Sequence, residues 1–129
     1  MPTVSQASFI PKNIIRKIAS VTGVDANSLA STALAFEPGL SLANAMPSFA
    51  IVKYRTGTVA AAVVRLDIGA VPVGPLAVLI GMTATKPSIF NVLSSAGTVV
   101  DISQSLQLSC TTVNTSAMTV DCDVFGAVY

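Results

Sequence analysis

The sequence contains no histidine and no tryptophan, and only 10% of its 129 residues are charged. Without histidine, the commonest general base is missing, and so is the usual partner of a nucleophilic serine or cysteine. Zinc and iron sites that depend on imidazole are excluded for the same reason. Only six carboxylates are present to supply acid–base chemistry. We therefore expect a protein that is not an enzyme.

Cysteine is scarce as well, and the two that occur, Cys110 and Cys122, lack the CxxC spacing of a metal or redox site. They could form a disulfide between two paired strands if the geometry allows it. They could instead be two reduced thiols that pack as small apolar side chains. A catalytic cysteine would need an activating neighbour, and the sequence offers none.

The sequence has no dinucleotide-binding GxGxxG motif, no P-loop and no GxSxG motif. Asp121 and Asp123 flank Cys122 and would share one face of a strand. This pair could hold calcium or a cationic partner, or it could simply keep an exposed face polar. The second interpretation fits better, because calcium takes six or more oxygen ligands. We thus expect no catalytic residue, cofactor, metal site or small-molecule substrate.

The chain is instead rich in apolar residues, which make up 52% of it and give a mean hydropathy of +0.73. The most apolar region, residues 58–82, is interrupted by Arg65 and Asp67 and broken by two prolines. A membrane helix needs about 20 continuous apolar residues, so no membrane span is expected. Residues 1–6 lack the pattern of a signal peptide. We expect synthesis and assembly in the cytoplasm of a host cell.

A chain with so few charges has more apolar surface than a small core needs. Such a composition is typical of a subunit whose faces are covered by neighbours, and it predicts a homo-oligomer or a place in a larger assembly. The net charge of +1 argues against a nucleic-acid binder.

Apolar and polar residues alternate with a period of two at residues 106–112 and 118–124, which predicts two half-buried strands. If the chain reverses at residues 115–117, a hairpin forms in which Cys110 lies opposite Cys122 and Thr112 lies opposite Val120. This register places the apolar side chains of both strands on one face.

Further strands are expected at residues 48–54 and 59–68, which could form a hairpin. Residues 76–83 are apolar on both faces, which predicts a central strand. Residues 89–93 could form a short strand, and another is expected to begin at residues 99–102. Because no helix fits between consecutive strands, parallel crossovers are not expected. The sequence predicts a mainly β fold, an antiparallel β-sandwich or small barrel that could be jelly-roll-like.

One or two short helices are expected before these strands. Pro11 suits the first turn of a helix, and Gly23 suits its end. A second helix, residues 26–36, could be capped by Asp25. The apolar stripe of the first helix, at spacings of three and four with one flanking residue, comprises Ile14, Ile15, Ile18 and Val21.

We expect residues 1–129 to form a single domain, with residues 1–10 as an extended N-terminal arm. The basic cluster of Lys12, Arg16 and Lys17 could be a solvated helix face, a contact with an acidic patch on a neighbour, or a contact with nucleic acid. The last is least favoured, because three charges bind weakly and no aromatic residues lie among them. The candidate interface residues are Val4, Phe9, Ile10, Lys12, Arg16 and Lys17.

These expectations together suggest a virion structural protein, most concretely a capsid-decorating or cementing protein of a bacteriophage. Its partners would be further copies of itself, the major capsid protein, or both, and a main capsid shell protein is the near variant. The alternative is a carbohydrate- or protein-binding β-sandwich module of the adhesin or fibre-head type. Such a module needs exposed aromatic residues, and the chain has only five phenylalanines and two tyrosines.

Overall fold

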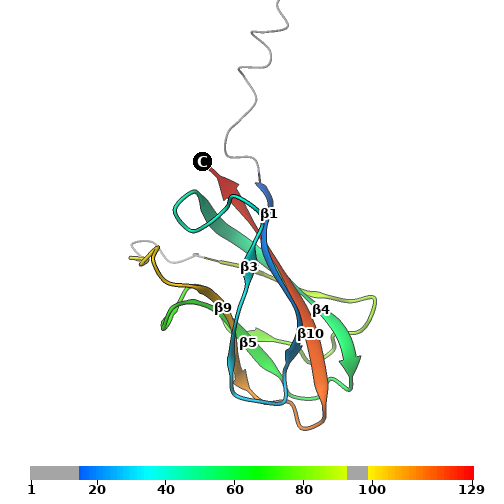
Figure 1. Cartoon of the computed structure of the whole chain (residues 1–129). Helices are drawn as coiled ribbons and strands as arrows, with labels where there is room; N and C mark the ends of the chain where they lie inside the picture. Colours follow the sequence, from blue (N-terminus) through cyan, green and yellow to red (C-terminus); the bar gives the residue numbers. More distant parts are fainter. Residues whose placement is uncertain (1–14, 93–98) are drawn as a thin grey trace, which may run out of the picture.

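The computed structural model describes residues 15–92 and 99–129, which form two antiparallel β-sheets packed against each other (Figure 1). In order across the sheet, sheet A contains β3 (Ala35–Phe36), β1 (Ile15–Asp25), β10 (Met118–Val128), β4 (Ala45–Gly57) and β8 (Ser88–Asn91). Sheet B contains β2 (Ser31–Ala33), β9 (Leu106–Thr112), β5 (Val63–Ile68) and β6 (Val71–Pro72), with β7 (Ala77–Val78) also paired to β5. The predicted mainly β sandwich is confirmed.

The hydrophobic core lies between the sheets, and the alternation in the sequence identifies the side chains that fill it. Every second residue of β10 from Met118 to Val124 is buried, as are Val64, Leu66 and Ile68 of β5. Each aliphatic side chain of this kind stabilises the fold by about 1.5–3 kcal/mol when it leaves water. The strands are therefore held together mainly by their inner faces.

The predicted hairpin of residues 106–124 is wrong, because β9 belongs to sheet B and β10 to sheet A. β10 pairs with β1 on one side and β4 on the other, so that Cys122 lies opposite Val21 and Val52. Val120 lies opposite Tyr54 and not opposite Thr112. The hairpin predicted for residues 48–68 fails in the same way, since β4 and β5 are in different sheets. Both inner faces contact one core, so alternation identifies the buried side chains but not the sheet.

Two connections that cross between the sheets, β4–β5 and β9–β10, lie at the lower end of the sandwich in Figure 1. They meet at the buried side chain of Asn114. Its Oδ1 atom accepts hydrogen bonds from the backbone N–H groups of Ala60 and Ala61, at 2.8 and 2.9 Å. Its Nδ2 atom donates to the carbonyls of Thr58 and Ser116. One side chain thus ties the β4–β5 connection to the β9–β10 connection.

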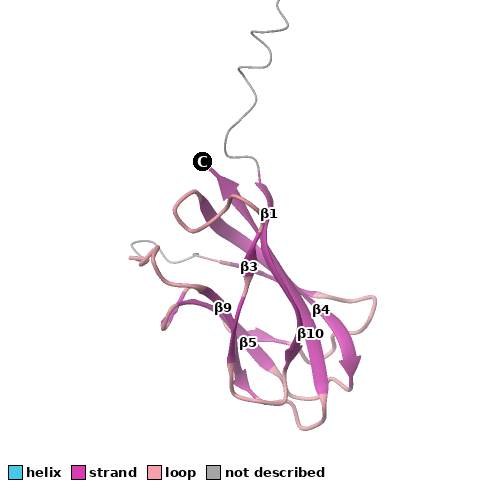
Figure 2. Cartoon of the chain, viewed as in Figure 1, coloured by secondary structure: helices cyan, strands magenta, loops and turns pink. Residues whose placement is uncertain are grey.

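Neither predicted helix is present in the described part of the chain, where Figure 2 shows strands and loops. Residues from Ile15 onward form β1, and residues 11–14 lie outside the described ranges. The register of β1 shifts between Lys17 and Ala19 and again between Val21 and Val24. The first bulge turns both Ile18 and Ala19 into the core. Ile18 and the partly buried Val21 therefore both face the core at a spacing of three, whereas Ile15 of the predicted stripe is 48% exposed.

The second predicted helix is replaced by a crossing from sheet B to sheet A. β2 pairs with β9, β3 pairs with β1, and the buried Leu34 lies between them. The carboxylate of Asp25 accepts a hydrogen bond from the backbone of Asn27 at 2.8 Å. Asp25 therefore stabilises a turn at the end of β1, where the sequence suggested a helix cap.

Two other predicted strands are also wrong. Of residues 76–83 only β7 is a strand, and alternate side chains there are exposed, so the segment is an edge and not a central strand. Residues 99–102 form no strand. The short strand expected at residues 89–93 corresponds to β8.

Candidate interaction surface

The outer face of sheet A, which points away from the core, is largely apolar in its upper half. All described strands belong to one of the two sheets, so no further strand covers this face. Ile51 of β4 lies opposite Ile89 of β8, and Met46 lies opposite Ala127 of β10. Ile89 is 63% exposed. Apolar side chains thus pair across neighbouring strands on the solvent side of the sheet, and Ile15, Ala127 and Met46 form one row across three strands. The row of Ile51 and Ile89 also contains Asp123 of β10.

Two phenylalanines lie at the centre of these rows. Phe49 and Phe125 lie opposite each other on β4 and β10. Their rings stack with centroids 5.0 Å apart and planes only 7° from parallel. Stacking covers one face of each ring with the other and stabilises the pair by about 0.5–1.5 kcal/mol beyond area burial. We call the set Ile15, Met46, Phe49, Ile51, Ile89, Phe125 and Ala127 the aromatic patch.

Ion pairs border the aromatic patch. Lys53 donates to Asp123 with an Nζ–Oδ2 distance of 2.7 Å, and this hydrogen bond raises the pKa of Lys53. Arg55 contacts Asp121 at 3.3 Å, and Asp121 also accepts a hydrogen bond from the backbone of Gly23. The two carboxylates do share the outer face of β10, as alternation requires. Each is paired with a cation from β4.

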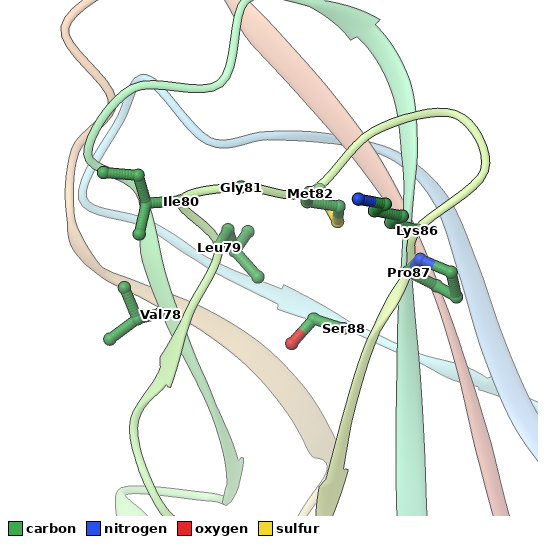
Figure 3. A pocket seen from close by; sticks show the side chains of 8 residues that line it. All are labelled: Val78, Leu79, Ile80, Gly81, Met82, Lys86, Pro87 and Ser88. Atoms are coloured by element: carbon green, nitrogen blue, oxygen red, sulfur yellow. The ribbon is translucent and has the colours of Figure 1, made fainter.

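A second exposed apolar surface lies at the edge of sheet B. Leu76, Val78 and Ile80 are 59%, 58% and 66% exposed, whereas Ala77 and Leu79 between them are buried. Figure 3 shows Val78 and Ile80 pointing to one side of the chain and Leu79 to the other. Val78 pairs with Val63 of β5, whose neighbour Val64 is in the core. We call Leu76, Val78 and Ile80 the edge ridge; it points outward from sheet B.

The predicted basic cluster is not one helix face. Arg16 and Lys17 are consecutive residues of β1, so their side chains point to opposite sides of sheet A. Lys17 contacts Glu37 at 3.5 Å and lies next to Phe125, at the border of the aromatic patch. The other candidate interface residues lie outside the described ranges: Val4, Phe9, Ile10 and Lys12.

The outer face of sheet B holds a polar network. The buried Asp67 accepts hydrogen bonds from Arg65 at 2.7 Å and from the hydroxyl of Ser109 at 2.8 Å. Ser31 bonds to Ser109 at 2.8 Å. Both oxygens of the Asp67 carboxylate accept hydrogen bonds from the guanidinium of Arg65. The network joins β2, β9 and β5 across the outer face of sheet B.

Shallow hollows surround the loop that follows the edge ridge. One, of about 210 Å³, lies between residues 78–82 and residues 86–88 (Figure 3). Another, of about 240 Å³, is lined by Lys53, Tyr54, Thr83 and Asp121 among others. Tyr54 donates its hydroxyl hydrogen to Gly57 O, and Lys53 is bonded to Asp123. Two prominent polar groups of this hollow are thus already bonded within the protein.

Cys110 and Cys122 are both free and buried, so the structure has two thiols where the sequence left a disulfide open. Burial raises the pKa of both thiols, that of Cys122 to about 12. A thiol with so high a pKa is almost entirely protonated at neutral pH and is a poor nucleophile.

The alternation in residues 48–54 predicts that Phe49, Ile51 and Lys53 share one face of their strand, but it does not show which face is outward and assigns them no role. The sequence does show that residues 49–52 are all apolar, so that both faces of this part of the strand are apolar. Phe125 lay beyond the predicted end of the last strand. The edge ridge was interpreted as part of a central strand, since an apolar run has the same pattern in either position.

Within residues 15–92 and 99–129, no three carboxylate or thiol side chains gather as a metal site would require. None of these residues forms a helix that is long and apolar enough to cross a membrane. Comparison of the chain with family models, curated proteins and solved structures gave no match.

Proposed function

We propose that this chain is a virion structural protein without enzymatic activity, most concretely a bacteriophage capsid-decorating or cementing subunit. In this role it holds neighbouring subunits together by burying apolar surface. A main capsid shell subunit would use the same contacts and is the near variant of the proposal.

The observation that carries the proposal is the presence of two separate apolar surfaces on opposite sheets. The aromatic patch lies on the outer face of sheet A, and the edge ridge points outward from sheet B. A subunit that joins neighbours needs at least two such surfaces, whereas a module that binds one ligand needs a single site. Apolar exposure of this kind is costly in an isolated protein and marks contact surfaces.

The direct test is to look for the chain in purified virus particles from the host that produces it. Apolar contacts are not screened by ions, so we expect the chain to remain on the particles through a wash in high salt. We expect V78S and I80S variants, which change the edge ridge, to be retained less. The matched control is L29S, because Leu29 is an exposed apolar residue outside both surfaces. Absence of the wild-type chain from washed particles would overturn the proposal.

The hollow beside Tyr54 supports a second candidate, a carbohydrate- or protein-binding module. Its volume and its single aromatic ring suit one sugar ring stacked on Tyr54. This candidate ranks second because the nearby hydroxyl of Tyr54 and the amine of Lys53 are bonded within the chain. Binding to a glycan array that is lost in a Y54A variant would favour it.

A further inference from the structure

The distribution of aromatic residues in this chain is unusual for a small β-sandwich. Among the described phenylalanines, Phe90 is buried in the core and Phe36 packs against it. Phe49 and Phe125 are instead stacked on the outer face of sheet A. In a chain with only seven aromatic residues, five phenylalanines and two tyrosines, this places a large apolar contact where no described strand covers it. Both side chains are only partly buried in the single chain, and aromatic residues at the centre of a patch are typical of the energetic centre of an interface.

The charges around the aromatic patch identify the kind of partner. Lys17 pairs with Glu37, Lys53 with Asp123 and Arg55 with Asp121, all within one chain. These six groups carry no net charge, so they neither repel an identical surface nor attract a strongly charged one. A nucleic acid or an acidic protein would require unpaired cations here. The identical face of a second copy has an apolar centre and a rim without net charge, so it matches this face in both respects.

The size of the face is sufficient for a stable contact. The five strands of sheet A contain 2, 11, 11, 13 and 4 residues, in their order across the sheet. With strands about 4.8 Å apart and a rise of about 3.3 Å per residue, the whole face covers about 650 Å². This lies within the range of about 600–1,000 Å² that each partner contributes to a standard interface. The polar rim and aromatic centre match the usual anatomy of such an interface.

We propose that the outer face of sheet A binds the same face of a second copy of this chain. The contact is two-fold symmetric, with the Phe49–Phe125 stacks of the two copies at its centre. This inference rests on the proposed function, because it names the partner of one of the two apolar surfaces. The edge ridge of each copy then remains available for the particle.

Sedimentation equilibrium of the purified full chain tests the inference. We expect the wild type to be a dimer and the F125S and F49S variants to dissociate at least about tenfold more readily, as for central interface aromatics. Because both side chains lie outside the core, the variants should keep the thermal unfolding transition of a folded domain. L29S and V78S serve as matched controls, and their dimer dissociation constants should be unchanged.

A wild type that is monomeric at all concentrations would overturn the inference. So would a dimer that V78S dissociates and F125S does not, since that dimer would form through the edge ridge. These outcomes are distinct from those of the particle test. If the chain is a monomer but is present in washed particles, the dimer is excluded and the proposed function is retained. If it is a dimer but is absent from particles, the proposed function is excluded and the dimer interface is retained.

Discussion

At the scale of single residues, Asn114 shows how one polar side chain can hold two connections of the chain together. Its amide is buried, and it uses both its acceptor and its donor on backbone groups of two connections. In the described residues, no buried side-chain nitrogen or oxygen lacks a hydrogen-bond partner. If one of these hydrogen bonds is lost, a buried backbone group is left without a hydrogen-bond partner. Asn114 therefore stabilises the crossings between sheets.

We expect Asn114→Ala to lower the free energy of unfolding by about 3 kcal/mol, because four backbone groups lose their partner. Urea denaturation measures this directly. The matched control is Asn27→Ala, at an exposed asparagine of the β1–β2 connection, where a change within about 0.5 kcal/mol is expected. A similar small effect at Asn114 would contradict its assigned role.

The buried thiol of Cys122 makes the stability of the fold depend on pH. Burial, with a smaller contribution from Asp123, raises the pKa of its thiol from 9.0 to about 12. Between these pH values the unfolded chain has lost the thiol proton while the folded chain keeps it. The free energy of unfolding therefore falls as pH rises above 9.

Urea denaturation of the wild type and of Cys122→Ala, below and above this pH, measures the contribution of the thiol. The variant is less stable at neutral pH because a buried side chain is shortened. We expect it to lose less stability than the wild type as the pH is raised. Equal losses in the two proteins would show that Cys122 does not titrate in this way.

At the scale of strands, the sequence predicts which side chains are buried but not how strands pair. The buried residues of β5, β9 and β10 follow the alternation closely. Which strands pair depends on where the chain crosses between the sheets, and these crossings have no local pattern in the sequence. In β1, a bulge at Lys17–Ala19 breaks the period of two and gives an apparent helical spacing. An aperiodic feature of this kind is decided by pairing with β10, which is distant in sequence.

The candidate surface was predictable only in part for the same reason. Alternation places Phe49 and Ile51 on one face of their strand, but it cannot show that Phe125 lies opposite Phe49 or that Ile89 lies opposite Ile51. Neighbours on a sheet come from its register, which is a property of the whole fold. The aromatic patch therefore became visible only when β4, β8 and β10 were assembled.

The inner face of β10 provides a test at this scale. We expect Val120→Asp to destabilise the protein by about 4 kcal/mol or more, because a carboxylate would be buried without a partner. Thr119→Asp, one residue earlier and on the outer face, should cost far less. Chemical denaturation of both variants gives the comparison. Equal effects would mean that the assigned faces of β10 are wrong.

At the scale of the whole molecule, the low charge and the two apolar surfaces have a common explanation. A chain with a net charge of +1 and so many apolar residues is poorly suited to remain a free monomer. Burial of the aromatic patch against a second copy and of the edge ridge against a particle would cover both surfaces. Composition and structure thus support the same proposed role in assembly.

The predicted N-terminal arm gives a further test at this scale. Residues 1–10 lie outside the described ranges, and the sequence predicts an extended segment that contacts a neighbour. We expect deletion of residues 1–10 to weaken retention on the particle while leaving the thermal unfolding midpoint unchanged. A large fall in the midpoint would show that the arm is part of the core.

We propose that the exposed apolar side chains of this protein form interfaces with other subunits. The native mass of the wild-type protein, measured by light scattering over a concentration series, shows whether they do. We expect a dimer or a larger species that persists on dilution. A monomer at every concentration, in solutions that stay free of aggregates, would contradict it.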